Sequence, residues 1–430
     1  MADGFTLAAE RTGAAKDASL LSRFEAVRAR SVALAAPLSP EDQVVQSQPD
    51  SSPTKWHLAH STWFWETFVC VPYAPDWGPA DAEYAFLFNS YYEALGARHA
   101  RPERGLLTRP SVEQVLQYRA RVDDGVRAAL AAEGDALEAL VTLGVAHEEQ
   151  HQELLLMDIQ HLFASQPTFP AYAVRDRAEA SEAVEPLRWV SFDGGLQEVG
   201  WDGEGFAFDN EGPRHRVWLE PYTLGDRLIT NGEWLQFMAD GGYATATLWL
   251  SDGWEAARTN GWTAPQYWVE RDGAWHRASL HGLEPVEAAE PVAHISLYEA
   301  DAFARWAGAR LPTEFEWEAA STSSSPDGNF LDSGALRPMP ARQGAGGLRQ
   351  MFGDLWEWTS SAYQPYPGFR TADGAIGEYN GKFMVNQAVL RGGCCATPPG
   401  HVRASYRNFY HPHQRWMFSG VRLARDAATS

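Results

Sequence analysis

The distribution of tryptophan divides the chain into two parts. Only four of its eighteen tryptophans precede position 180. Up to about residue 165 the chain is rich in Ala, Leu, Glu and Arg with helical periodicity, whereas beyond about residue 187 it is rich in Gly, Trp and turn residues. The segment between them has three prolines and no sustained periodicity, which is typical of a linker. We therefore expect a helical domain over residues 1–165, a linker over 166–186 and a second domain over 187–430.

Charge and cysteine content exclude several classes of protein. The 430 residues include 35 basic and 56 acidic side chains, and the net charge of −21 repels nucleic-acid backbones and anionic membranes. The three cysteines, Cys70 and the adjacent Cys394 and Cys395, do not make the even, spaced set of a secreted disulfide-bonded protein. Since signal-peptide and long apolar patterns are also absent, we expect a soluble cytoplasmic protein without nucleic-acid or membrane partners.

Four helices are predicted in the first part of the chain. The first covers about residues 18–36. The second begins where Ser52 can act as the N-cap and Pro53 can take the first helical position. The third opens at Ser111, with Gln114 at the spacing of a capping box. Together with a fourth helix, they favour an antiparallel bundle, in which cofactor sites are built from inward side chains.

The second part is predicted to contain many short strands joined by long, glycine-rich loops. Helices are expected only over about residues 299–308 and 314–320. A chain with so many loops needs aromatic anchors to offset the entropy of ordering its backbone, so we assign most of the tryptophans to packing.

The fourth predicted helix, over about residues 135–163, carries a candidate metal site. His147 and His151 are four positions apart and can therefore bind one ion from the same helix face. The second helix offers His57 and His60, in WHLAH, as a third ligand, and spacing alone leaves both open. Three neutral imidazoles suit iron(II) that binds a thiolate and then dioxygen, and equally suit zinc with a hydrolytic water.

Two other functions compete with iron chemistry. The residues H-E-E-Q-H also satisfy the pattern of zinc peptidases, in which Glu148 would be the general base. However, Leu154 stands where the extended peptidase motif has a further histidine. The other hypothesis is a non-catalytic, lectin-like binding module carried on a structural bundle, which needs no stoichiometric metal.

Seven ordered motifs show a resemblance that covers nearly the whole chain. The first three are WHLAH, FNSYYEALGARHARPERGLLTRP and HEEQHQELLLMDIQH, which resemble the DinB-like domain of the ergothioneine-biosynthesis sulfoxide synthases, the EgtB family. The others are RLPTEFEWEAA, MFGDLWEWTSS, VLRGG and RNFYHPHQRWMFSGVRLAR, which resemble the formylglycine-generating-enzyme-like, C-type-lectin-like domain of those enzymes. The resemblance implies an α+β fold of two domains, with an N-terminal DinB-like four-helix bundle.

This resemblance implies a reaction and an iron site. The family joins a thiol sulfur to the imidazole C2 of hercynine, which is Nα-trimethylhistidine, and oxidises that sulfur to a sulfoxide with non-haem iron(II) and O2. Forming the C–S and S–O bonds removes four electrons, the number that O2 accepts. By motif match the iron ligands are His60, His147 and His151, and His57 becomes a residue that contacts the ligands without binding the metal, or a packing residue. Copper chemistry of the formylglycine-generating type is rejected, because its two cysteines are several residues apart whereas Cys394 and Cys395 are adjacent.

Residues for the substrates also follow from the resemblance. Gln150 matches a glutamine that hydrogen-bonds the hercynine imidazole, and Arg101 and Arg104 match arginines that bind the thiol substrate's carboxylate. The C-terminal motif assigns three more residues to substrate binding: Asn408, Phe409 and Trp416.

The thiol donor and the proton donor are predicted from departures and matches within the family. Relatives that use γ-glutamylcysteine hold it with an aspartate and an arginine, and Tyr410 and Gln414 stand at those positions here. We therefore expect free cysteine, with γ-glutamylcysteine as the alternative. Tyr91 and Tyr92 match a tyrosine pair that supplies the proton for O2 reduction, whereas Tyr379 is nearest to the tyrosine of the other branch.

Overall fold

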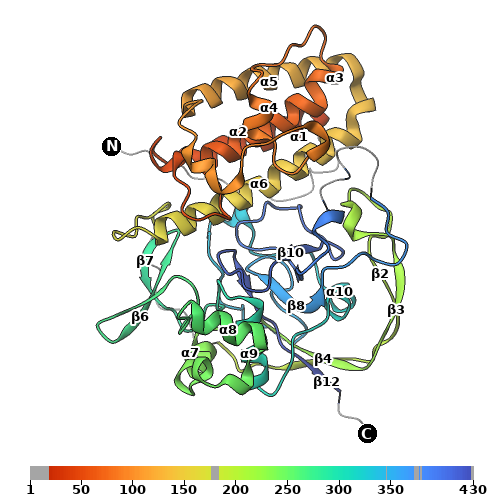
Figure 1. Cartoon of the computed structure of the whole chain (residues 1–430). Coiled ribbons are helices and arrows are strands. Elements are labelled where there is room, and N and C mark those ends of the chain that lie inside the picture. The colour runs from red at the N-terminus through yellow and green to blue at the C-terminus, as the bar shows by residue number, and fades with distance from the viewer. Residues whose placement is uncertain (1–18, 176–183, 345, 372–376, 378–379, 428–430) are drawn as a thin grey trace. The chain divides into compact units, whose positions relative to one another are not determined.

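The computed structural model describes residues 19–175, 184–344, 346–371, 377 and 380–427. The chain divides into two compact units, one of residues 1–162 with 332–334 and the other of residues 163–331 with 335–430 (Figure 1). Residues 176–183 of the predicted linker lie outside the described residues. In the described part of the chain, no helix is both long enough and apolar enough to cross a membrane.

In the part of the first unit that the structure describes, four long helices predominate, drawn red to yellow in Figure 1. They are α1 (Leu20–Ala35), α2 (Thr54–Trp65), α5 (Val112–Glu133) and α6 (Glu138–Ala164). Shorter turns connect them: η2 (Asp42–Val44), η3 (Glu66–Cys70), α3 (Val71–Tyr73), α4 (Tyr84–Phe88), η4 (Glu93–Leu95), η5 (Arg101–Leu106) and η6 (Gly134–Leu137). All twelve residues of α2 are buried, so this helix is the centre of the bundle.

One of the predicted helix starts is confirmed and another is wrong. The capping box at Ser111 and Gln114 is confirmed at the start of α5. The prediction for Ser52 is wrong, because α2 begins at Thr54 with Pro53 as its N-cap and without a side-chain cap. The Ser52 hydroxyl, which would have made the cap, instead accepts from Arg104 Nη1 at 2.9 Å. A tertiary contact has therefore replaced the local cap.

Among the described residues of the second unit, twelve short strands form four small sheets. The strands are β1 (Trp189–Phe192), β2 (Gly195–Val199), β3 (His215–Leu219), β4 (Tyr222–Gly225), β5 (Trp268–Arg271), β6 (Ala274–Ser279), β7 (Gly282–Pro285), β8 (Trp356–Ala362), β9 (Ala388–Arg391), β10 (Asn408–Tyr410), β11 (Ser419–Gly420) and β12 (Ala424–Asp426). Their orders are β1-β4-β12, β10-β9-β8-β11, β2-β3 and β5-β6-β7. The pairs are antiparallel except β11 with β8, and β10 lies at the edge of its sheet.

The second unit has more helix than the sequence predicts. The two expected helices are α9 (Leu297–Trp306) and α10 (Glu314–Ser321). Two others, α7 (Asn231–Ala239) and α8 (Ser251–Thr259), were not predicted. Tryptophan does serve as a packing residue here, since four indoles are less than 2% exposed: Trp234, Trp317, Trp356 and Trp358.

Candidate metal centre

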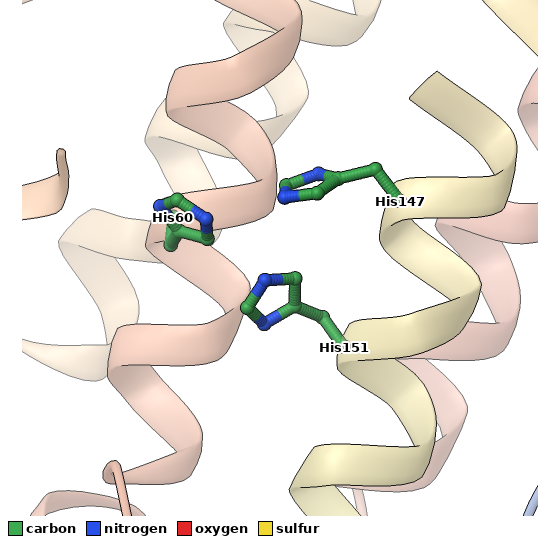
Figure 2. A group of neighbouring side chains, drawn as sticks. All are labelled: His60, His147 and His151. Atoms are coloured by element: carbon green, nitrogen blue, oxygen red, sulfur yellow. The ribbon is translucent and has the colours of Figure 1, made fainter. Parts of the chain in front are cut away.

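Three histidines from two helices of the first unit converge on one point. His60 comes from α2, and His147 and His151 come from successive turns of α6. Each offers a ring nitrogen, and these nitrogens all lie within 4.8 Å of one another. Figure 2 shows the three rings turned toward one another in the space between the two helices. The i, i+4 spacing on α6 and the buried position of α2 thus bring together three of the four histidines that the sequence analysis names as candidate ligands.

The three rings are neutral at pH 7. Burial is the largest cause in each case, and it lowers the pKa of His147 to about 4. Burial and the neighbouring His147 lower the pKa of His60 well below its ordinary value, and burial and His60 do the same for His151. Each ring therefore keeps a lone pair for a metal ion. Three neutral nitrogen donors fit a divalent iron or zinc ion.

A backbone carbonyl fixes the tautomer of His60. His60 Nδ1 lies 2.5 Å from the carbonyl oxygen of Phe88, which can only accept, so Nδ1 carries the proton. The lone pair is then on Nε2, which suits metal binding. The Trp56 indole stacks on the His60 ring with centroids 4.6 Å apart and planes 9° from parallel. Contacts on two sides hold this imidazole.

His57 lies beside the three histidines without joining them. Its Nδ1 is 2.9 Å from His151 Nδ1, and its Nε2 is 2.9 Å from Asp158 Oδ2. His57 is buried and contacts one member of the group, His151, through a hydrogen bond instead of merely packing against it.

Glu148 is occupied by structural contacts. Its carboxylate accepts from Arg28 at 3.0 Å, from Arg119 at 2.9 Å and also from Ser31 and Trp65. Burial opposes its ionisation, but Arg28 and Arg119 outweigh burial and hold the pKa of Glu148 well below its ordinary value. A carboxylate so strongly paired is a poor proton acceptor. The arrangement therefore disfavours a zinc peptidase with Glu148 as general base.

Arg104 lies near the three histidines and is buried. Its guanidinium lies 3.4 Å over the Trp56 ring and donates to the hydroxyls of Ser52, at 2.9 Å, and Ser90, at 3.0 Å. Arg104 makes no ion pair with any residue that the structure describes. Burial, and then the charge of Arg101, lower the pKa of this guanidinium. An anion placed beside it would restore the missing charge balance.

The other predicted residues of the first unit lie on the loops and helices around this group. Tyr91 accepts a hydrogen bond from Arg101 Nη1 at 2.6 Å. Tyr92 is buried and packs on Trp63, with ring centroids 5.7 Å apart. Gln150 is a half-buried residue of α6, directly before His151.

The C-terminal candidates belong to the second unit. Asn408 and Phe409 are on β10, where the Phe409 ring stacks on Tyr363 at 4.1 Å. Trp416 is buried and packs edge-on against Tyr410, with centroids 5.6 Å apart. The Gln414 side chain accepts from the His411 amide at 2.9 Å. Tyr379, the alternative proton donor, lies outside the described residues.

Asp158 and Trp56 are contributors that sequence reasoning missed. Asp158 follows His151 by seven residues, two helical turns, so it lies on the same side of α6. That spacing was a usable signal for a carboxylate near the histidines. No sequence signal indicated a role for Trp56, because an indole in an apolar helix is ordinarily a packing residue.

Comparison with protein families assigns each part of the chain. Residues 23–163 match the DinB superfamily, and residues 175–343 and 332–427 match the sulfatase-modifying factor enzyme 1-like domain. The predicted fold class, a DinB-like helical domain followed by a domain of mixed α and β structure, is therefore confirmed. The fold and the histidines define a two-domain protein with a candidate metal centre in its helical part.

Three similar proteins indicate which family within this class the chain belongs to. The chain is 34% identical to the hercynine oxygenase of Mycobacterium tuberculosis over 89% of this chain and 92% of that protein. It is 37% identical to the hercynine oxygenase of Mycolicibacterium smegmatis over 66% of this chain and 71% of that one. The formylglycine-generating enzyme of Streptomyces coelicolor is 28% identical over 52% of this chain and 84% of that protein. The chain belongs to the hercynine oxygenase (EgtB) family and is an oxygen-using oxidoreductase, as the sequence predicts.

Proposed function

We propose that this protein catalyses iron(II)- and O2-dependent C–S bond formation between the imidazole C2 of hercynine and the sulfur of cysteine. The product is hercynyl-cysteine sulfoxide, an intermediate of ergothioneine biosynthesis. The observation that carries the proposal is the set of three neutral ring nitrogens within 4.8 Å of one another, in a chain of the hercynine oxygenase family.

His60, His147 and His151 would hold the iron. Iron(II) bound there supplies a site for the thiol sulfur and O2 and carries electrons between them. Without a carboxylate ligand the site keeps the full charge of the ion, which favours a thiolate as an additional ligand. Coupling and sulfur oxidation remove four electrons from the two substrates and O2 accepts four, so the reaction requires no external reductant.

Arg104 would bind the carboxylate of the thiol substrate, together with Arg101. The support is the buried guanidinium without an ion pair among the described residues, held in place by Trp56 and by two hydroxyls. A guanidinium can meet a carboxylate with two parallel hydrogen bonds. With its carboxylate bound to Arg104, the same substrate would then present its sulfur to the three histidines.

Cysteine is the proposed thiol donor. Neither Tyr410 nor Gln414 carries a charge, and both have neighbours of their own, in Trp416 and His411. A γ-glutamyl group, with an ammonium and a carboxylate, would lack the ion pairs that an aspartate and an arginine provide. Gln150 and Asn408 are proposed to bind hercynine, and Phe409 and Trp416 are proposed to contribute to substrate binding.

Tyr91 and Tyr92 are proposed to deliver the proton that O2 reduction needs. The Tyr91 oxygen accepts from Arg101, so its own O–H hydrogen takes no part in that contact. Exchanging either tyrosine for phenylalanine is expected to divert turnover toward sulfur oxidation without coupling. Unchanged product ratios in both variants would refute this role.

One experiment tests the proposal as a whole. The protein is loaded with Fe(II) without oxygen, mixed with hercynine and a thiol, and exposed to air while O2 uptake is recorded. Mass spectrometry should find a product that contains both the sulfur and one added oxygen, at a higher rate with cysteine than with γ-glutamylcysteine. Absence of O2 uptake contradicts the reaction, and hydrolysis that survives strict exclusion of O2 would support a peptidase.

A further inference from the structure

Asp158, His57 and His151 form a continuous line of hydrogen-bonding atoms. Asp158 Oδ2 lies 2.9 Å from His57 Nε2, and His57 Nδ1 lies 2.9 Å from His151 Nδ1. The three residues come from two helices, since His57 is on α2 and the others are on α6. His57 and Asp158 are buried, and His151 is half-buried. Both nitrogens of His57 are therefore used, one toward a carboxylate and one toward a candidate metal ligand.

The direction of these hydrogen bonds follows from their two ends. A carboxylate only accepts, and Asp158 Oδ2 also receives the Ser52 amide at 2.8 Å, so His57 Nε2 carries a proton and donates it. A neutral His57 then has its lone pair on Nδ1, which accepts from His151 Nδ1–H. His151 is consequently left with its lone pair on Nε2, directed away from His57.

We propose that Asp158 and His57 are positioning residues that hold His151 in its Nε2 metal-binding tautomer through a carboxylate–histidine–histidine relay. His60 achieves the same result by donating to the Phe88 carbonyl. Partners of this kind orient metal-binding histidines generally, and their loss costs about 10–100-fold in metal affinity. The inference rests on the proposed iron site and adds to it two residues that act through His151.

Two substitutions of His57 separate this role from simple packing. In His57→Asn the amide oxygen takes nearly the position of Nδ1 and can still accept from His151, whereas His57→Phe keeps the ring volume but has no acceptor. The relay therefore predicts iron affinity near that of the wild type for His57→Asn and a loss of about 10–100-fold for His57→Phe. A packing role predicts the reverse order, since phenylalanine leaves the smaller cavity.

The measurement is Fe(II) affinity without oxygen, by competition with a coloured chelator, together with the visible spectrum of the Co(II)-loaded protein. Neither depends on turnover. His161→Phe is the matched control, because His161 is also on α6 but bonds to Ser47 at 2.7 Å. Its affinity and spectrum should equal those of the wild type. Equal affinities for wild type, His57→Asn and His57→Phe would overturn the relay.

Asp158 provides a second test if His57→Phe does not fold. Asp158→Asn keeps an oxygen that accepts from His57, whereas Asp158→Ala frees His57 to present Nδ1–H toward His151. We expect a loss of affinity of about 10-fold or more for Asp158→Ala and much less for Asp158→Asn. Equal affinities for these two variants would overturn the relay. A wild-type protein that binds no Fe(II) would instead contradict the proposed function, so the two failures are distinguishable.

Discussion

Two groups of arginine in the first unit have opposite surroundings. Arg28 and Arg119 share the buried carboxylate of Glu148, and Arg28 also pairs with Asp123 at 2.7 Å. Arg104 is equally buried, yet its contacts are hydroxyls and an indole, without an ion pair to any described residue. A buried charge is costly unless it is paired. The first group therefore holds the helices together, whereas the surroundings of Arg104 fit its proposed role of binding an anionic substrate.

The largest effect is expected for Glu148→Gln. Removing this charge leaves Arg119 without an ion pair among the described residues and leaves Arg28 with Asp123 alone, which costs about 3–5 kcal/mol of the free energy of unfolding. Chemical denaturation at pH 7 measures it. Glu149→Gln is the control, because Glu149 pairs at 3.4 Å with the partly exposed Arg30, a contact worth about 1 kcal/mol or less. A stable Glu148→Gln protein that lost only a hydrolytic activity would reverse the assignment of Glu148.

At acid pH the wild type and Glu148→Gln should have the same free energy of unfolding. Because the pKa of Glu148 in the folded protein is below its ordinary value of 4.5, the stabilisation is complete above about pH 4.5 and is lost progressively as the pH falls below it. The two free energies of unfolding should therefore converge between pH 4.5 and pH 2. A constant gap at every pH would mean that the carboxylate charge is not what stabilises the bundle.

Arg104→Gln should affect substrate binding and spare the fold. The KM for cysteine is expected to rise about 10–100-fold, since a charged hydrogen bond to a carboxylate is worth about 1.5–3 kcal/mol. The thermal midpoint should stay constant or rise, because an unpaired buried charge is removed. Arg127→Gln, on an exposed arginine of α5 that pairs with Glu25, should change neither quantity. A destabilised Arg104→Gln protein with normal KM would place Arg104 with the structural arginines.

The smallest effect is expected for Trp56→Leu. This change removes the indole beneath the Arg104 guanidinium, a cation–π contact worth about 1–2 kcal/mol when desolvated. The KM for cysteine should rise about 5–30-fold, and Trp56→Phe should recover most of the loss because it keeps a ring face. Steady-state kinetics on both variants provides the measurement. An effect of Trp56→Leu larger than that of Arg104→Gln would contradict the ranking.

Local patterns predicted the first unit better than the second. The bundle helices repeat their apolar residues over several turns, and Ser111 with Gln114 marks the start of α5. By contrast α7 and α8 have nine residues each and carry Gly232 and Gly253 near their starts, which obscured the helical pattern. The capping box of Thr230 with Glu233 was the available signal for α7.

The sequence was sufficient to predict the part of the candidate site whose geometry is set by a single helix. The i, i+4 spacing was sufficient to pair His147 with His151, but His57 and His60 are three residues apart and only the packing of α2 on its neighbours shows which ring joins them. Likewise the role of Glu148 depends on Arg28 and Arg119, which come from other helices. Contacts between distant segments decide these roles, and no local pattern records them.

The burial of α2 on every side has a consequence for recognising related proteins. H-E-E-Q-H also fits peptidases and therefore identifies little by itself. A helix without a solvent-facing side has no position at which substitutions are free, so a saturation mutagenesis library should tolerate fewer changes across Thr54–Trp65 than across any exposed helix of the bundle. That short stretch is the better signature for finding further chains that carry the same centre.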